Sequence, residues 1–182
     1  MSADAGPAKV QIRNVETADL AAIQKIYAHH VIHGLASWEE TPPDLDEMTE
    51  RCDTILAGGF PYLVAVADGR VMGYAYAGKY RPRPAYRNTV ENSVYVAHDA
   101  AGRGIGAALL DALIERCTAL GFRRMVAIIG DSGNAASIGL HAKAGFEHVG
   151  VIPSCGYKRG QWLDQVIMQM PLGDGDTTAP EI

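Results

Sequence analysis

Glycine residues crowd one short stretch of the chain in a pattern that suits phosphate binding. Gly102, Gly104 and Gly106 alternate with other residues, one of which is Arg103, and they lie between a Val- and Tyr-rich run (residues 89–96) and an apolar helical pattern. Glycines let a backbone turn sharply and approach a ligand closely, and the first amides of a helix are free to bind an anion. We therefore predict a pyrophosphate cradle here, with Arg103 adding a cation.

Three kinds of glycine loop bind phosphate groups, and their spacing separates them. A nucleotide triphosphate P-loop requires G-x-x-x-x-G-K-[ST], a string that the sequence lacks. A dinucleotide loop requires G-x-G-x-x-G/A, which Gly102, Gly104 and Ala107 satisfy. That loop usually follows its strand directly and opens a βαβ pair, whereas several residues separate Val96 from Gly102 here. The third kind, a coenzyme A loop, depends on a second motif.

The second motif runs from Asn134 to Phe146 and reads NAASIGLHAKAGF. With the glycines upstream, it resembles the paired motifs of the GNAT acetyltransferases, [QR]-x-x-G-x-[GA] and then N-x-x-[AS]-x-x-L-Y-x-K-x-G-F. Ala101 replaces the Gln or Arg of the first motif, and His141 replaces the tyrosine of the second. Within this family, TVENSVYV, MVAIIG and GYKRGQWLD are similar to the phosphinothricin and methionine sulfoximine N-acetyltransferases.

The resemblance implies acetyl-CoA as co-substrate, no metal, and a small amino acid analogue as acceptor, such as phosphinothricin, methionine sulfoximine or methionine sulfone. It also implies a homodimer. The residues expected to bind the coenzyme are Val94, Tyr95, Val96, Gly102, Arg103, Gly104, Ile105, Gly106, Ala107, Asn134 and Ser137. The residues expected to bind the acceptor are Trp38, Arg81, Pro84, Ala85, Tyr86 and Glu91. Arg81 or a neighbour could hold the acceptor's carboxylate with its planar guanidinium.

Acetyl transfer to an amine requires a group that takes the amine proton and a fixed donor for the carbonyl oxygen. Glu91 is the only acid in the run 89–96 and, by alternation, shares a face with Ser93 and Tyr95. The resemblance favours Glu91 as general base, directly or through a water, over a carboxylate paired with a nearby Arg. The family strand is bulged, and an amide near Val94 would face the thioester oxygen. His141 could be a proton donor or a packing and hydrogen-bonding residue.

Three further features have both a functional and a structural interpretation. Trp38 could border the acceptor pocket or pack on the core. The basic segment 79–87 could be a solvated face or the mouth of the site. His29 and His33 are spaced as metal ligands on a helix often are, but no third ligand has suitable spacing, so a metal site is not expected.

Composition narrows the class of protein. The chain has 182 residues, of which 48% are hydrophobic and 20% charged, as in one ordinary globular domain. Its net charge of −5 argues against a nucleic-acid binder. No apolar run is long enough for a membrane span, and the N-terminus is unlike a signal peptide. The three cysteines are scattered and lack a C-x-x-C pair, which favours free thiols in the cytoplasm.

Apolar periodicity predicts the elements that position these residues. Their order, βααβββαβαββ, is that of the GNAT fold: an α/β protein with one mixed, mostly antiparallel sheet and helices on both faces. The closing strands are expected at residues 146–152 and 166–170, joined through residues 156–164. One domain would span residues 9–172, with residues 1–8 and 173–182 disordered.

Rival functions stay open at this point. The acceptor could be a protein amino terminus, a polyamine or an aminoglycoside, although an acidic chain with a locally basic pocket disfavours polycations. The protein could instead be a coenzyme A-binding sensor that has lost catalysis, against which Glu91 speaks. A dinucleotide-binding oxidoreductase is the third alternative.

Overall fold

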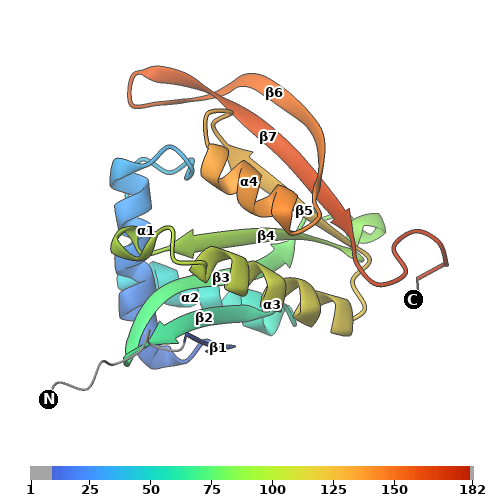
Figure 1. Ribbon diagram of the computed structural model, residues 1–182, viewed down its shortest axis with the longest axis horizontal. Helices are drawn as coiled ribbons and strands as arrows, with labels where there is room; N and C mark the ends of the chain where they lie inside the picture. The colour runs from blue at the N-terminus through green and yellow to red at the C-terminus, as the bar shows by residue number, and fades with distance from the viewer. Residues whose placement is uncertain (1–9, 181–182) are drawn as a thin grey trace, which may run out of the picture.

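The computed structural model describes residues 10–180, and its elements follow the predicted order (Figure 1). Residues 1–8 and 181–182, which were expected to be disordered, lie outside the described residues. The helices are α1 (Leu20–His33), α2 (Leu45–Ala57), α3 (Ile105–Ala119) and α4 (Ala135–Lys143). The strands are β1 (Gln11–Asn14), β2 (Tyr62–Ala67), β3 (Arg70–Lys79), β4 (Thr89–Val96), β5 (Arg124–Gly130), β6 (Glu147–Lys158) and β7 (Gln161–Pro171).

The strands form one seven-stranded sheet in the order β1-β2-β3-β4-β5-β7-β6. Every neighbouring pair is antiparallel except β4 and β5, which run parallel. A parallel pair needs a crossover connection, and α3 supplies it (Figure 1). The predicted fold class is therefore confirmed.

Helices cover both faces of the sheet. On one face, Tyr27 of α1 packs edge-on against Tyr95 of β4, with ring centroids 5.1 Å apart. On the other, Leu109 of α3 packs over Gly73 of β3, where a Cβ would lie 3.2 Å from the Leu109 side chain and 2.8 Å from the Tyr95 carbonyl oxygen. Gly106 of α3 lies against α4, so α3 and α4 share this second face. Most of the buried apolar side chains lie in these two layers.

The closing hairpin of β6 and β7 is longer than the sequence predicts. The connection is not the expected segment 156–164 but the short turn at Arg159 and Gly160, both of which have positive φ (52° and 79°). The pairing of β6 with β7 shifts register between His148 and Gly150 and again between Ile152 and Gly156. These irregularities let the strand continue through residues that usually end one.

The chain beyond Leu172 folds back against the start of β5. Arg123 contacts Thr178 and lies 3.3 Å from the Asp174 carboxylate. The domain boundary expected after Leu172 stays a prediction. Cys52 and Cys117 are buried and Cys155 is exposed, and none is in a disulfide. Within residues 10–180, no helix has the length and apolarity that crossing a bilayer would require.

Candidate active site

The central feature of the site is an opening between β4 and β5. The two strands pair from Thr89 and Arg124 as far as Asn92 and Ala127, although β4 continues to Val96 and β5 to Gly130. The segments beyond this point diverge and line a cavity together with the first turns of α4 and one residue of the loop after α1. The lining residues are Ala36, Asn92, Ser93, Val94, Tyr95, Ala127, Ile128, Ile129, Gly130, Asn134, Ser137 and His141.

The expected bulge in β4 is absent on the side of β3. The register between β3 and β4 runs without a shift from Lys79 and Val90 to Gly73 and Val96. The pairing of β4 with β5 ends after Asn92 because the two strands diverge, and not because β4 has a bulge. The alternation predicted for β4 therefore holds along its whole length, with Glu91 on the face opposite Asn92.

The glycine loop follows β4 and leads into α3. Gly102 and Gly104 adopt the left-handed conformation, with φ of 75° and 77°, and Gly104 is the N-cap of the helix. Glycine adopts this conformation without the steric cost that a Cβ brings. Residues 102–104 are exposed, so the turn that leads into the helix is open to solvent, and the first amides of a helix lack intrahelical partners and can bind an anion.

Glu91 is partly buried on the face of the sheet that α1 and α2 cover. Burial raises the pKa of the Glu91 carboxyl above its usual value, and the Arg81 guanidinium, 3.9 Å from the carboxylate, lowers it. Arg81 also stacks over the Tyr80 ring and donates to the Tyr80 carbonyl oxygen at 2.8 Å. The structure therefore brings Glu91 and Arg81 together, and both remain accessible to solvent.

The basic segment after β3 forms a short exposed turn of 3-10 helix at Pro84–Tyr86. The Tyr86 ring meets that of Tyr80 edge-on, with centroids 5.7 Å apart. Ala85 lies between Pro84 and Tyr86 on the same exposed turn. Because the Tyr80 ring contacts both the Arg81 guanidinium and the Tyr86 ring, the predicted acceptor residues 81 and 84–86 form one patch.

Trp38 lies in the loop between α1 and α2, 39% exposed. It packs against β6 at Gly156, where a Cβ would overlap the indole ring. Lys158, also on β6 and buried, donates to the Ser37 carbonyl oxygen at 2.7 Å. Burial lowers the pKa of the Lys158 ammonium. The closing hairpin therefore holds this loop, a contact that the sequence did not reveal.

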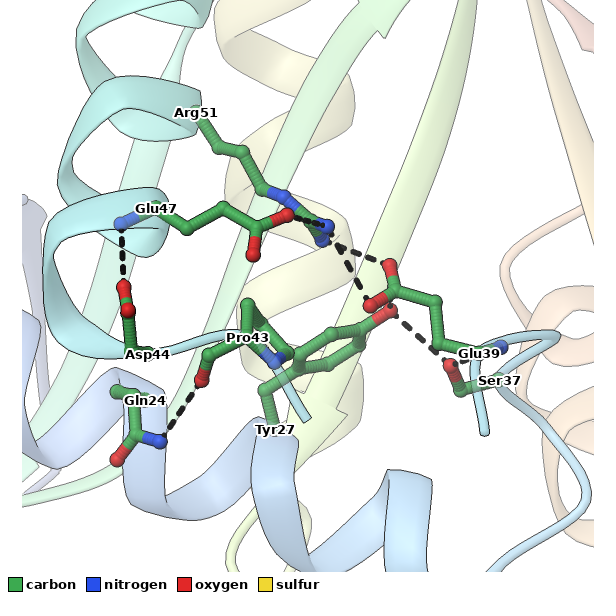
Figure 2. A network of polar contacts seen from close by, with 8 residues as sticks. All are labelled: Gln24, Tyr27, Ser37, Glu39, Pro43, Asp44, Glu47 and Arg51. Atoms are coloured by element: carbon green, nitrogen blue, oxygen red, sulfur yellow. Dashed lines mark hydrogen bonds and ion pairs between the residues drawn. The ribbon is translucent and has the colours of Figure 1, made fainter. Parts of the chain in front are cut away.

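A polar network fixes the same loop from the helices (Figure 2). Glu39 accepts from Arg51 of α2 at 2.7 Å and from the Tyr27 hydroxyl of α1 at 2.9 Å. The Tyr27 oxygen lies 3.0 Å from Ser37 Oγ, which must be the donor because Tyr27 gives its own proton to Glu39. Burial raises the pKa of Tyr27 to about 12, so its phenol keeps that proton.

His141 is a buried residue of α4, and its side chain contacts Asn92 of the sheet. Its Nε2 lies 2.9 Å from Asn92 Oδ1, and its Nδ1 lies 2.8 Å from the Ser137 carbonyl oxygen. Burial lowers the pKa of His141, and the hydrogen bond to the Ser137 backbone opposes that change. Asn92, which sequence reasoning did not single out, is thus the direct partner of a predicted site residue.

The histidines at the end of α1 do not form a metal site. The His29 ring stacks on that of His98 with centroids 4.3 Å apart, and it tilts against that of His33 at 4.7 Å. Across residues 10–180, no group of three or more His, Cys, Asp or Glu side chains is arranged to hold a metal ion.

Comparison with known proteins identifies the family. Residues 12–167 match the acetyltransferase (GNAT) domain. The chain is 56% identical to a phosphinothricin N-acetyltransferase of Alcaligenes faecalis, over 93% of this chain and 86% of that protein. It is 49% identical to an L-methionine sulfoximine/L-methionine sulfone acetyltransferase of Pseudomonas aeruginosa, over 93% and 98% of the two chains.

A solved structure supports the same conclusion. A GNAT phosphinothricin acetyltransferase of Sinorhizobium meliloti, crystallised with acetyl-CoA, superposes with a TM-score of 0.92 at 48% identity, covering 94% of this chain and 93% of that one. The protein described here belongs to the GNAT acetyltransferase family. It is an N-acetyltransferase, and the resemblance drawn from the sequence motifs is confirmed.

Proposed function

We propose that this protein transfers the acetyl group of acetyl-CoA to the amino group of a small amino acid analogue of the phosphinothricin, methionine sulfoximine or methionine sulfone type. The observation that carries the proposal is the pair of Glu91 and Arg81, 3.9 Å apart. Glu91 lies on β4, the strand that also contributes residues 92–95 to the β4–β5 cavity, and Arg81 lies on the segment between β3 and β4. A carboxylate and a guanidinium at this place suit an acceptor that has both an ammonium and a carboxylate group.

The chain fits the coenzyme at two places. Residues 93–96 offer a stretch of β4 that no longer pairs with β5, so its edge can accept an extended ligand. Gly102 and Gly104 shape a cradle at the start of α3 that suits a pyrophosphate. We assign the binding role to these segments and to Arg103, Ile105, Gly106, Ala107, Asn134 and Ser137. When bound, acetyl-CoA supplies the activated acetyl group, and an amide near Val94 would face its carbonyl oxygen.

In the proposed mechanism, Glu91 prepares the nucleophile. The acceptor amine must lose a proton before it can attack, and Glu91 takes that proton directly or through one water. Partial burial supports this role, because the raised pKa makes the carboxylate a better base. Arg81 holds the acceptor's carboxylate, and Trp38, Pro84, Ala85 and Tyr86 border the rest of its pocket. The amine nitrogen would then bond to the acetyl carbon as the carbon–sulfur bond breaks, and the released thiolate would take a proton from solvent. Holding the amine and the thioester in contact supplies much of the rate.

We further propose that the protein is a cytoplasmic homodimer. Its three free thiols suit a reducing compartment. The edge hairpin of β6 and β7 exposes a group of large apolar side chains, which marks a contact surface on a protein of this kind. These are Val149, Val151, Ile152, Tyr157 and Trp162, between 44% and 66% exposed.

Thiol release from acetyl-CoA, measured against a panel of acceptors, tests the proposal. The panel contains methionine sulfoximine, methionine sulfone, phosphinothricin, common amino acids, spermidine and an aminoglycoside. We expect turnover on the sulfoximine-like compounds, lowered by about 10² to 10⁴ in Glu91→Gln. Glu115→Gln, an exposed change on α3, serves as the control and should keep full activity.

Three results would contradict the proposal or a part of it. Turnover confined to spermidine, the aminoglycoside or common amino acids would reject the acceptor class. Coenzyme binding without turnover on any acceptor would favour a sensor that lacks catalysis. If Glu91→Gln turned over as fast as the unaltered enzyme, the assignment of the base would be wrong.

A further inference from the structure

Asn92 occupies the last paired position before β4 and β5 separate. Its backbone partner is Ala127, and its side-chain Nδ2 donates to the Val126 carbonyl oxygen of β5 at 3.2 Å. Its Oδ1 accepts from His141 Nε2 of α4 at 2.9 Å. Asn92 is only 6% exposed and His141 only 4%. One side chain therefore joins the two strands and the helix that together form the cavity.

The available partners determine how this amide is oriented. The opposite orientation would place Oδ1 against the Val126 carbonyl oxygen, so two acceptors would face each other. With Nδ2 on Val126, the atom that faces His141 is an oxygen, which can only accept. The other ring nitrogen of His141 lies 2.8 Å from the Ser137 carbonyl oxygen, which is also an acceptor. A neutral ring carries one N–H, which Nε2 donates to Asn92, and Nδ1 then has a lone pair that can accept from the Ser137 hydroxyl, 3.5 Å away. Both ring nitrogens therefore have partners within the protein.

This geometry separates the two roles that the sequence left open for His141. A general acid must present its proton to the leaving group within hydrogen-bond reach. A positioning residue must instead have fixed partners of its own, with every buried polar atom satisfied. His141 meets the second description, because both ring nitrogens contact oxygen atoms of the protein.

We propose that Asn92 and His141 form a positioning pair that sets the width of the β4–β5 opening. The Asn92 side chain joins β4 to β5 at the last paired position, through its hydrogen bond to Val126. His141 joins α4 to Asn92 and so fixes the helix relative to both strands. The wall formed by residues 93–95 then keeps its distance from the wall formed by residues 128–130, and Ser137 stays at the cavity. This inference rests on the acetyl-transfer function proposed above, since the opening is the expected place of the thioester.

Substitutions that keep the bond but remove the acid test the pair. The Gln side chain in His141→Gln can donate to Asn92 Oδ1 yet cannot release a proton at neutral pH. Leu in His141→Leu or Asn92→Leu fills space without hydrogen bonding. We expect His141→Gln to keep kcat and the KM for acetyl-CoA within about threefold. The retained hydrogen bond to Asn92 should hold the cavity walls nearly in place, and a small displacement of the walls costs little activity. Each Leu variant should lose about 100-fold in kcat/KM for acetyl-CoA, the scale of a displacement of about 1 Å.

The double variant Asn92→Leu/His141→Leu adds an independent readout. Residues that act as one unit give non-additive losses, so the double variant should be little worse than either single one. An acid role predicts the reverse pattern: a loss of about 10² to 10⁴ in His141→Gln as well, and additive losses. A loss in His141→Gln that shrinks with an acetyl thioester of a more acidic thiol would also overturn the positioning role.

Failure of the pair and failure of the proposed function can be told apart. The dissociation constant of coenzyme A, measured by calorimetry, does not depend on the acceptor. It should rise in both Leu variants and stay unchanged in His141→Gln, even if the acceptor panel gives no turnover. Thermal unfolding of every variant checks the fold. Unchanged coenzyme A affinity and activity in well-folded Leu variants would reject the pair.

Discussion

The Arg81 guanidinium affects the pH at which Glu91 can act as a base. A carboxylate base is lost as the pH falls through its pKa, so kcat/KM for the acceptor should decline on the acid side. Arg81 lowers that pKa, so in Arg81→Gln the acid limb should move to higher pH. Exposed ion pairs contribute about 1 kcal/mol or less, so the shift should be below about one pH unit. The measurement is the pH profile of kcat/KM.

A neighbouring arginine provides the matched control for this profile. Arg83 lies on the same exposed segment, and Arg83→Gln should leave the acid limb where it is. A limb that does not move in Arg81→Gln, or that moves to lower pH, would show that Glu91 does not set it.

Site residues differed in how far the sequence revealed them. Gly102 and Gly104 could be predicted because closely spaced glycines before a helix indicate a sharp turn. Both have positive φ in the structure. Glu91 was readable as the one acid in its strand. Asn92 was not, because its partners at Val126 and His141 are 34 and 49 residues away along the chain. No local pattern reports such contacts, although a buried asparagine among Val residues could have prompted the question.

At the scale of elements, the order of helices and strands was predictable, and the ends of the last hairpin were not. Gly150, Pro153 and Gly156 are residues that usually interrupt strands. In β6 they are absorbed by two register shifts, and Ser154 takes a positive φ of 49°. The extra length is stabilised by pairing with β7, and a pattern within one strand does not contain that information.

The start of α3 gives a prediction for the coenzyme cradle. Gly104 has φ of 77° and no atom near the place where a Cβ would be, so Gly104→Ala is strained by conformation and not by a clash. It should lower the free energy of unfolding by about 1–2 kcal/mol. Because it distorts the helix N-terminus, it should also raise the KM for acetyl-CoA about tenfold or more, while the KM for the acceptor stays nearly unchanged. Steady-state kinetics and thermal unfolding measure these effects.

The control is the same chemical change on another helix. Gly139 lies within α4 in ordinary helical conformation with open space around it. Gly139→Ala should raise the free energy of unfolding by up to about 1 kcal/mol through helix propensity, with both KM values unchanged. If the two variants affected the KM for acetyl-CoA equally, the cradle would not lie at Gly104.

For the whole molecule, the exposed apolar side chains of β6 and β7 predict a dimer contact. Trp162 is 66% exposed, and in a two-fold assembly each substitution occurs twice. Trp162→Glu should therefore place two repelling charges at the contact and shift the protein to monomer. Analytical ultracentrifugation across a range of concentrations measures the change.

Leu120 at the end of α3 supplies the comparison, since it is 52% exposed on a different part of the surface. Leu120→Glu should leave the oligomeric state of the unaltered protein intact. A monomeric unaltered protein, or a dimer that survives Trp162→Glu, would place the contact elsewhere or remove it.

The position of β7 in the sheet has a consequence for how the protein is made. β7 is the last strand along the chain, yet it lies between β5 and β6 (Figure 1). Until the residues of β7 have been added, β6 lacks the strand with which it pairs. During that time β5 is an open edge of the sheet that can pair with a wrong strand. Because β5 forms one wall of the cavity, we expect catalytic competence to arise only after β7 has paired with β5, in a late step of folding.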